Sequence, residues 1–293
     1  MRFLTFEQHG SLNSAPVFSA FRDSVKKLGH ELVNDYNQAD AAVIWSVLWH
    51  GRMAANREIL ENFTKIGKPV VVLEVGSIHR GTTWKVGVGG INGEAAFNHQ
   101  QNHNQTRFNQ LGLKLQPWST KNHGKIVICC QHSLSHQWRN MPRTDIWLDT
   151  VIKNVRAVSD REILIRPHPR QPIPNIEKFT KMPKITIDIP KKLLGTYDDF
   201  NFESVLESAH CVINWSSNPA IQAVFKGIPI FTGPDSLAYP VSEKSLKNIE
   251  NPTYSDRQAW ANDFVYTEWT VDEISQGQPL KQILPILENF NNT

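Results

Sequence analysis

The chain has 293 residues, of which 40% are hydrophobic and 20% charged, and its formal net charge is +3 at pH 7. This composition excludes an intrinsically disordered chain, because the apolar residues suffice to build buried cores. The length exceeds what one core usually organises, so two domains are expected. The mild basicity is compatible with a phosphate-bearing ligand or with nucleic acid and requires neither.

Cysteine content and apolar runs bear on the compartment. The three cysteines, Cys129, Cys130 and Cys211, form no metal-ligand spacing and leave an odd thiol, which indicates a reducing compartment without a disulfide framework. No apolar run approaches the roughly 18 residues that a membrane span requires. The first residues, MRFLTFEQHG, lead into a strand-like pattern and lack the features of a secretory signal. We therefore expect a cytoplasmic protein, of a bacterium or of a phage-infected cell.

The N-terminal half alternates strand-like and helix-like segments. Phe3 to Phe6 is a predicted strand, and residues 16–28 form a predicted helix that ends at Gly29. The strand-like run AAVIWSVL is followed by the helix-like NREILENFTKIG, which ends at Gly67, and then by KPVVVLEVG. Such alternation is typical of α/β units around mainly parallel sheets.

From Ser77 to about Lys121 the pattern weakens into a segment rich in Gly, Asn, Gln and His, with a helix-like stretch around Leu111. Segments of this length without strong periodicity are usually functional or mobile, and the alternative is a solvated loop without a ligand. The part HRGTTWKVGVGGING has neither the Gly-Lys-Ser/Thr of a P-loop nor the order of a dinucleotide fingerprint. We expect Trp84 and Lys85, among its glycines, to serve acceptor recognition or the closure of a lid.

A second α/β region begins near residue 123, where the chain enters the buried-strand run Lys125 to Cys130. The helix-like DIWLDTVIKNVRAVS, the strands EILIRPHP and KITIDIP and the helix-like NFESVLESA follow in turn. The stretch CVINWSSNPAIQAVFKGIPIF then predicts a strand, a tight polar loop, a helix and a second strand. In it, Asn218 is the expected N-cap, Pro219 the first helical residue and Gly227 the end of the helix.

Two polar motifs follow neighbouring strands of this second half. Ligands of open α/β sheets bind beyond the carboxyl ends of the strands, where both ILIRPHPRQ and NWSSNPAIQ lie. The first motif offers cationic or donor groups on a loop stiffened by two prolines, and the second offers hydroxyls at a helix N-terminus. The expected phosphate-binding residues are Arg166, His168, Arg170, Ser216, Ser217 and Asn218. Either motif alone is more often structural, and their joint occurrence indicates a diphosphate site.

The order of these motifs resembles a known family. RPHP after a strand, followed by Ser-Ser opening a helix that ends in KGIPIF, is similar to the C-terminal domain of GT-B glycosyltransferases of the capsular polysaccharide type, including bacterial Kdo and sialic acid transferases. The resemblance implies that His168, Ser216 and Ser217 bind the phosphates of a nucleotide-sugar. The later stretch SLKNIENPTYSDRQAWANDFVYTEWTVDEISQG also looks like the tail of small bacterial and bacteriophage glycosyltransferases.

The resemblance implies the α/β fold called GT-B, in which two Rossmann-like domains with parallel sheets face a central cleft and a C-terminal helix crosses back. The expected parts are an acceptor-side domain at residues 1–122, a nucleotide-sugar-binding domain at 123–275 and the crossing helix at 276–293. GT-B chemistry needs no essential metal, because helix dipoles and cationic side chains stabilise the leaving diphosphate. The nearest acidic pair, Asp198 and Asp199, is interpreted as the start of the helix at Phe202, and neither metal nor cofactor is expected.

A glycosyltransferase also needs a group that deprotonates the acceptor hydroxyl, and in GT-B proteins this group comes from the N-terminal domain. Glu74, at the carboxyl end of VVVLEVG, is the first candidate. Glu7 and His9 after the first strand are competitors, as is His50 after the second, which is also a candidate on the acceptor side. The alternative for Glu74 is a solvated or structural carboxylate.

We expect a transferase that moves a sugar from a nucleotide-activated donor, for example a UDP-sugar, to an acceptor hydroxyl. Inversion by direct displacement is expected because no covalent nucleophile is evident. The mild basicity and nine tryptophans fit a phage-type enzyme that acts on a hydroxymethylated pyrimidine in DNA, and a glycan acceptor in capsule or lipopolysaccharide synthesis is the nearest alternative.

Three other functions stay open at this point. In CDP-polyol phosphotransferases the corresponding loop reads Asp-Tyr-Ser-Ser, whereas here Asn214 and Trp215 precede the serines. A nucleotide-sugar epimerase would use the same architecture without an external acceptor. A non-catalytic module that binds a nucleotide-sugar or a nucleic acid would retain the phosphate loops alone.

Overall fold

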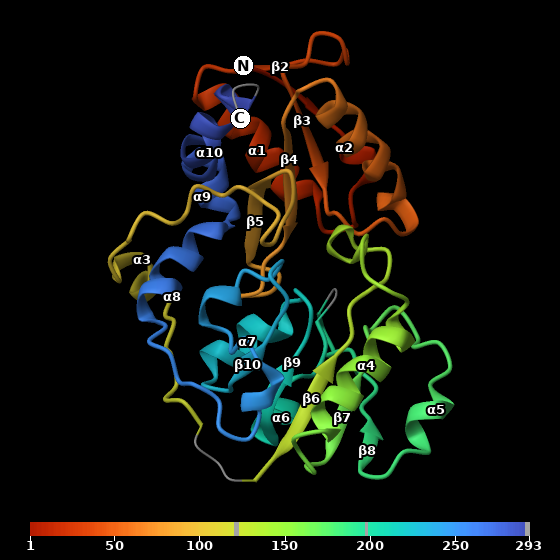
Figure 1. The fold of residues 1–293 in the computed structure, drawn as a ribbon. Helices are drawn as coiled ribbons and strands as arrows, with labels where there is room; N and C mark the ends of the chain where they lie inside the picture. The colour runs from red at the N-terminus through yellow and green to blue at the C-terminus, as the bar shows by residue number, and fades with distance from the viewer. Residues whose placement is uncertain (120–122, 197–198, 291–293) are drawn as a thin grey trace. The chain divides into compact units, whose positions relative to one another are not determined.

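The computed structural model describes residues 1–119, 123–196 and 199–290. The chain forms two compact units (Figure 1): Met1–Phe108 and Ala261–Thr293 make up unit 1, and Asn109–Trp260 make up unit 2. Unit 1 is thus assembled from two separate stretches of sequence. Among the described residues, no helix is long and apolar enough to cross a membrane.

Unit 1 is built on a six-stranded sheet with the order β11-β5-β4-β3-β1-β2. The strands β2, β1, β3 and β4 pair in parallel, whereas β5 is antiparallel to both of its neighbours, β4 and β11. The bounds are β1 (Arg2–Thr5), β2 (Glu31–Leu32), β3 (Ala41–Trp45), β4 (Val70–Val75), β5 (Thr83–Val88) and β11 (Glu268–Thr270).

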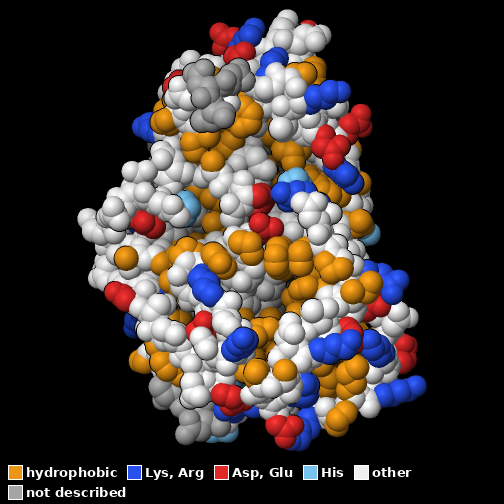
Figure 2. Space-filling view, in the orientation of Figure 1, with side chains coloured by type: hydrophobic (Ala, Val, Ile, Leu, Met, Phe, Trp, Pro, Cys, Tyr) orange, Lys and Arg blue, Asp and Glu red, His pale blue; other side chains and the backbone are white. Residues whose placement is uncertain are grey.

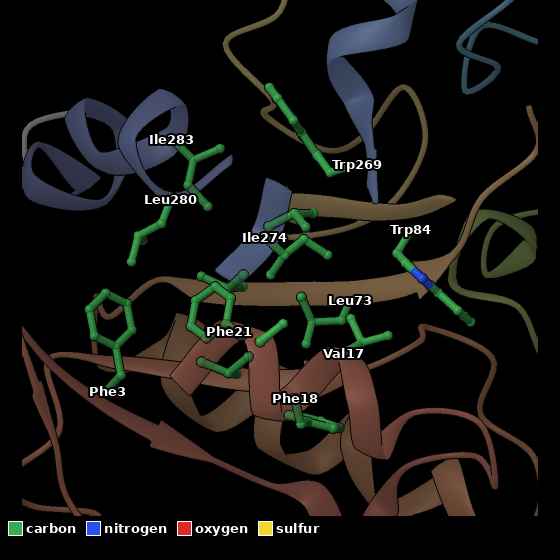
Figure 3. Packing of buried hydrophobic residues seen from close by; sticks show 14 of the residues in the cluster. Phe3, Val17, Phe18, Phe21, Leu73, Trp84, Trp269, Ile274, Leu280 and Ile283 are labelled. Carbon is green, nitrogen blue, oxygen red and sulfur yellow. The ribbon is translucent and has the colours of Figure 1, made fainter. Parts of the chain in front are cut away.

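Helices cover both faces of this sheet, because successive side chains of a strand point to opposite faces. Val71 and Leu73 of β4 join a core with α1, α9 and α10, which Figure 3 shows, whereas Val70 and Val72 join a second core with α2. The bounds are α1 (Ala15–Lys27), α2 (Asn56–Lys65), α3 (Thr106–Gln110), α8 (Gln258–Phe264), α9 (Val271–Ser275) and α10 (Gln278–Glu288), with short 3-10 helices η1 (Glu7–His9), η2 (Gly51–Ala55) and η6 (Val265–Thr267).

The glycine-containing segment that was expected to be an irregular loop contains strand β5. All six residues of β5 are buried, with Trp84 only 5% and Lys85 only 1% exposed. The indole of Trp84 packs against that of Trp45, with ring centroids 5.8 Å apart. The prediction of a mobile loop at these two residues is therefore wrong, because the run pairs on both edges, with β4 and with a strand from the far end of the chain.

Unit 2 is built on a five-stranded parallel sheet with the order β10-β9-β6-β7-β8. The strands are β6 (Lys125–Cys129), β7 (Ile163–Arg166), β8 (Ile185–Ile187), β9 (Ala209–Ile213) and β10 (Ile230–Phe231). The helices are α4 (Thr144–Arg156), α5 (Glu177–Thr180), α6 (Glu203–Glu207) and α7 (Pro219–Phe225), with η3 (His136–Trp138), η4 (Tyr239–Val241) and η5 (Leu246–Asn248). The predicted alternation of strands and helices in this half is confirmed.

The compact units begin and end at other residues than the expected domains. Residues before 123 belong to unit 2, because the backbone N–H of Gln116 donates to Phe225 O at 2.9 Å and that of Ser119 donates to Gly227 O at 2.7 Å. Gly227 allows this close approach: its φ is +74°, and a Cβ there would lie 2.0 Å from Pro117 O. At the other end, residues from 261 onward belong to unit 1, because β11 completes its sheet.

The carboxylate of Glu268 fastens β11 to unit 1. Glu268 is fully buried and accepts hydrogen bonds from the backbone N–H of Ser77 at 2.7 Å and of Ile78 at 3.0 Å. The hydroxyls of Ser77 and Thr83 donate to it as well. Lys85 stands opposite Glu268 in the strand register. Burial lowers the pKa of Lys85, and the carboxylates of Glu268, Glu74 and Glu94 partly oppose this shift.

Replacing Glu268 by Gln tests this attachment. One carboxylate oxygen becomes an NH2 group that faces N–H or O–H donors, so we expect the free energy of unfolding to fall by about 2–4 kcal/mol. Urea unfolding measures the loss, and hydrogen exchange of the amides at Ser77 and Ile78 should rise. Glu288→Gln, at an exposed position of α10, is the control. Equal stability of the two variants would contradict this role.

Candidate functional site

Three polar loops leave unit 2 at the same edge of its sheet. They follow β6 (residues 130–135), β7 (167–171) and β9 (214–218). β6 lies between β7 and β9 in the sheet and runs parallel to both, so the three loops emerge side by side at the carboxyl edge. In open α/β sheets this edge is where ligands bind.

Ser216 joins the loop after β9 to the loop after β6. Its backbone N–H and its hydroxyl both donate to Gln131 Oε1, at 3.1 and 2.9 Å. Gln131 in turn donates from Nε2 to Ser135 Oγ at 2.8 Å. Ser216 and Gln131 are both buried. Both donors of Ser216 are therefore committed within the protein, and its hydroxyl is oriented to hold the two loops together.

Ser217 is placed differently from its neighbour. It is half-buried, and Asn214 Nδ2 donates to its carbonyl oxygen at 2.7 Å and to its Oγ at 3.1 Å. Because Oγ accepts from Asn214 and no acceptor for its proton is found among the described residues, the hydroxyl of Ser217 can donate to a ligand. In the described ranges, its backbone N–H has no hydrogen-bond partner either. Ser217 thus offers two donors to an anion at this edge.

Asn218 stands at the N-cap position of α7, and Pro219 is in the first turn as expected. The side chain of Asn218, however, makes no capping hydrogen bond to the helix. The predicted cap is correct in position and wrong in its side-chain bond, because Asn218 itself has helical dihedral angles, φ −53° and ψ −28°. A capping side chain usually requires extended dihedrals at this position.

The turn after β7 fixes the tautomer of His168. Its Nδ1 accepts the backbone N–H of Arg170 at 3.2 Å, so in the neutral ring Nε2 carries the proton. His168 is half-buried and Arg170 is exposed. An imidazole N–H and an exposed guanidinium therefore stand on the same short turn, stiffened by Pro167 and Pro169.

Arg166 does not share the surroundings of His168. Its buried guanidinium forms an ion pair with Asp188 and donates to Asn201 O, and it lies over the ring of Phe202 with its Cζ 5.1 Å from the centroid. The charge of Arg166 is balanced by Asp188, and these contacts fasten the end of β7 to the segment before α6. We interpret Arg166 as a residue that supports the site.

The loop after β6 was not among the expected site residues. Ser133 donates from its backbone N–H to Gln171 Oε1, and Gln171 Nε2 donates back to Ser133 Oγ, both at 2.6 Å. The loop is thereby bonded to the turn of His168 as well as to Ser216. A sequence signal was present, since CCQHS is a polar run directly after the buried central strand, the same signal that marks the other two loops.

In unit 1, Glu74 lies near the carboxyl end of β4. It is half-buried, and its Oε1 accepts the backbone N–H of Val75 at 2.7 Å. In the register of β4 and β5 it stands opposite the buried Lys85. In its charged form this carboxylate can accept a proton from a hydroxyl group.

The competing residues of unit 1 differ in their surroundings. Glu7 forms an ion pair with Arg22 and accepts from Thr5 Oγ1 at 3.1 Å. His9 is half-buried in η1, and its carbonyl oxygen accepts from Asn56 Nδ2 at 3.3 Å. His50 is exposed at the start of η2. Asn56 also donates to Trp45 O, so it connects η1 to the end of β3.

The acidic pair considered for a metal lies partly outside the described residues, which do not include Asp198. Asp199 Oδ1 accepts the backbone N–H of Phe200 at 2.9 Å, and α6 begins shortly after, at Glu203. Across residues 1–119, 123–196 and 199–290, no group of three His, Cys, Asp or Glu side chains is arranged to hold a metal ion.

Part of the surface of unit 2 carries charges of both signs. Around α4, α5 and β8, Lys and Arg side chains are interspersed with carboxylates (Figure 2). Lys178 and Lys153 both contact Asp149, and Lys184 contacts Asp160. Such alternation is typical of a solvated face. This face gives no support to the expected DNA acceptor.

Several solved structures are similar to this chain. A KpsC beta Kdo 2,4 transferase from Thermosulfurimonas dismutans has a TM-score of 0.53 at 10% identity, covering 98% of this chain and 97% of that one. A KpsC beta Kdo 2,7 transferase from that organism has a TM-score of 0.46 at 12% identity, covering 96% and 99%. A UDP-GlcNAc 2-epimerase from Methanocaldococcus jannaschii has a TM-score of 0.34 at 11% identity, covering 87% and 81%.

At these identities the likeness concerns the fold alone. It confirms the predicted fold class, α/β of the GT-B type with Rossmann-like units. No protein-family model matches the sequence, and no curated protein sequence matches it.

Replacing Gln131 by Ala tests the connection between the loops. The buried N–H and O–H of Ser216 would lose their acceptor, so we expect the free energy of unfolding to fall by about 2–4 kcal/mol. Ser135→Ala removes only the partner of Gln131 Nε2 at a half-buried position and should cost about 1 kcal/mol. Urea unfolding compares the two. An equal loss in both would show that Gln131 does not hold Ser216.

Proposed function

We propose that the protein is a glycosyltransferase that takes a sugar from a nucleotide-activated donor and that unit 2 binds the donor phosphates. The observation that carries this proposal is the position of Ser217 and His168. Both present donors at the carboxyl edge of one parallel sheet, on loops that the segment after β6 bonds to each other. This is the edge at which α/β sheets hold nucleotide phosphates.

The chemistry of the donors supports a leaving phosphate. When the bond between the sugar and the phosphate breaks, negative charge grows on the phosphate oxygen. N–H and O–H donors that are already oriented stabilise that charge without reorganisation. Ser217 supplies a hydroxyl and a backbone N–H, His168 supplies Nε2–H, and the exposed guanidinium of Arg170 supplies a positive charge. Ser216 orients the loop, and both of its donors bond to Gln131 and not to the phosphate.

We propose Glu74 of unit 1 as the base that accepts the proton of the acceptor hydroxyl as its oxygen attacks the sugar. Glu7 is less suited, because its carboxylate is already bonded to Arg22 and to the hydroxyl of Thr5. His9 is the next candidate. Attack on the sugar by the acceptor oxygen, with departure of the phosphate, is a single displacement and inverts the anomeric centre.

The fold is compatible with this function, and the structure with the highest of the TM-scores given above is named a Kdo transferase. We therefore rank a glycan acceptor above DNA. A hydroxymethylated pyrimidine in DNA stays a prediction from composition. The assays below distinguish the proposed transferase from a nucleotide-sugar epimerase, a CDP-polyol phosphotransferase and a non-catalytic binding module.

Nucleotide binding tests the donor site. Isothermal titration with UDP, CMP, CDP and GDP should identify a nucleotide that binds the wild-type protein. Ser217→Ala and His168→Ala should each weaken that binding about 10-fold or more, because a hydrogen bond to a charged group contributes about 1.5–3 kcal/mol.

Ser208→Ala is the matched control, since Ser208 is exposed at the amino end of the same strand β9. An unchanged affinity of both site variants would overturn the phosphate assignment. If no nucleotide of the panel binds the wild-type protein, the proposed function itself is wrong.

Glu74→Gln should keep the nucleotide affinity and lower the rate of sugar transfer about 10²- to 10⁴-fold, because proton transfer in the transition state is lost. The rate is measured as nucleotide release and labelled product, with glycan primers and with hydroxymethylcytosine DNA as acceptors. Glu61→Gln, exposed in α2, is the control.

Full turnover by Glu74→Gln would show that another residue is the base, and His9 would then be the first candidate. Product formed without any acceptor would indicate the epimerase, and release of a polyol phosphate would indicate the phosphotransferase.

A further inference from the structure

His132 lies in the loop after β6, between two residues that are bonded to the neighbouring loops. Gln131 accepts from Ser216 on one side, and Ser133 exchanges two hydrogen bonds with Gln171 on the other. Residues 131–133 of the loop after β6 therefore lie between the loops after β9 and β7. The backbone at His132 is held from both sides.

The side chain of His132 is itself fixed. It is 3% exposed, and its Nδ1 accepts the backbone N–H of Leu134 at 3.1 Å. The ring packs against that of His168 with centroids 5.0 Å apart and planes at 86°, an edge-to-face contact. The buried imidazole of His132 thus forms a wall, a rigid surface on one side of the half-buried His168 ring.

His168 is only half-buried, and the contact with His132 adds to the contacts that define its orientation. Its turn is half-exposed, and the hydrogen bond to its Nδ1 comes from the backbone of the exposed Arg170 at 3.2 Å. An edge-to-face contact from a second direction restricts rotation of the ring about its side-chain torsions. A ring that is already oriented loses less conformational entropy when it binds an anion.

We propose that His132 is a positioning residue for His168, which sets the direction of the Nε2–H of His168 and acts on the phosphate only through it. The expected effect of His132 on nucleotide affinity rests on the proposed function. Its effect on the orientation of the His168 ring can be measured without a nucleotide. Loss of the wall should let the His168 ring sample other orientations and the other tautomer.

The first measurement needs no ligand. Long-range ¹H–¹⁵N NMR spectra of the histidine rings should show the Nε2–H tautomer for His168 in the wild-type protein. In His132→Ala the His168 signals should move toward the average of two tautomers, and in His132→Phe, which keeps an aromatic wall, they should stay close to wild type. Unchanged His168 signals in His132→Ala would overturn the proposal whatever the protein binds.

The second measurement is a double-mutant cycle with the nucleotide that binds best among UDP, CMP, CDP and GDP. His132→Ala should weaken binding about 10-fold, and His132→Phe less than 3-fold. In the His168→Ala background, His132→Ala should have no further effect, because its route to the phosphate is gone. An equal 10-fold loss in both backgrounds would mean that His132 contacts the ligand directly or supports the fold, and would overturn the positioning role.

His123→Ala is the matched control. His123 is exposed before the amino end of the same strand β6, at the opposite edge of the sheet. If Ser217→Ala and His168→Ala weaken binding while His132→Ala does not, the proposed function stands and this inference fails. If the wild-type protein binds none of the four nucleotides, the proposed function fails, and the NMR comparison still decides whether His132 orients His168.

Discussion

The buried carboxylate of Glu268 is the interaction on which the architecture of unit 1 depends. A charge in a dry interior is costly unless donors surround it, and here two backbone N–H groups and two hydroxyls do so. This arrangement attaches β11 to β5 and so brings the segment after it, α9 and α10, onto the face of the sheet that α1 covers. Trp269 of β11, Ile274 of α9 and Leu280 of α10 all belong to the core of Figure 3.

Unit 2 uses neutral amides for the comparable task. Gln131 and Gln171, the one after β6 and the other after β7, bond the three loops to one another with no charge taken out of water. The functional consequence is a division between the two adjacent serines. Ser216 is turned into the protein, whereas Ser217 receives the amide of Asn214 and is left to offer its own proton. Asn214 suits this role because an aspartate there would have no proton to donate.

The strands and helices of the second half could be predicted from sequence because each obeys a local rule: apolar runs form the strands, and Pro219 and Gly227 bound α7. The two polar motifs after β7 and β9 could also be located from sequence, because each directly follows an apolar run. Strand β5 could not be predicted, since its edge partner β11 is remote in sequence and burial of Lys85 depends on that pairing. The orientation of Ser216 and the part of His132 depend in the same way on contacts that only the folded sheet creates.

The division of unit 1 into two stretches has a consequence for synthesis of the protein. Unit 2 is one continuous stretch, Asn109–Trp260, and can fold as soon as it has left the ribosome. The sheet of unit 1 begins first and finishes last, because β5 keeps an unpaired edge until Glu268–Thr270 has been made. During that interval the nascent chain exposes a strand edge and the apolar face that α10 later covers, both of which favour association with other chains. Packing of α10 on the core of unit 1 covers that apolar face.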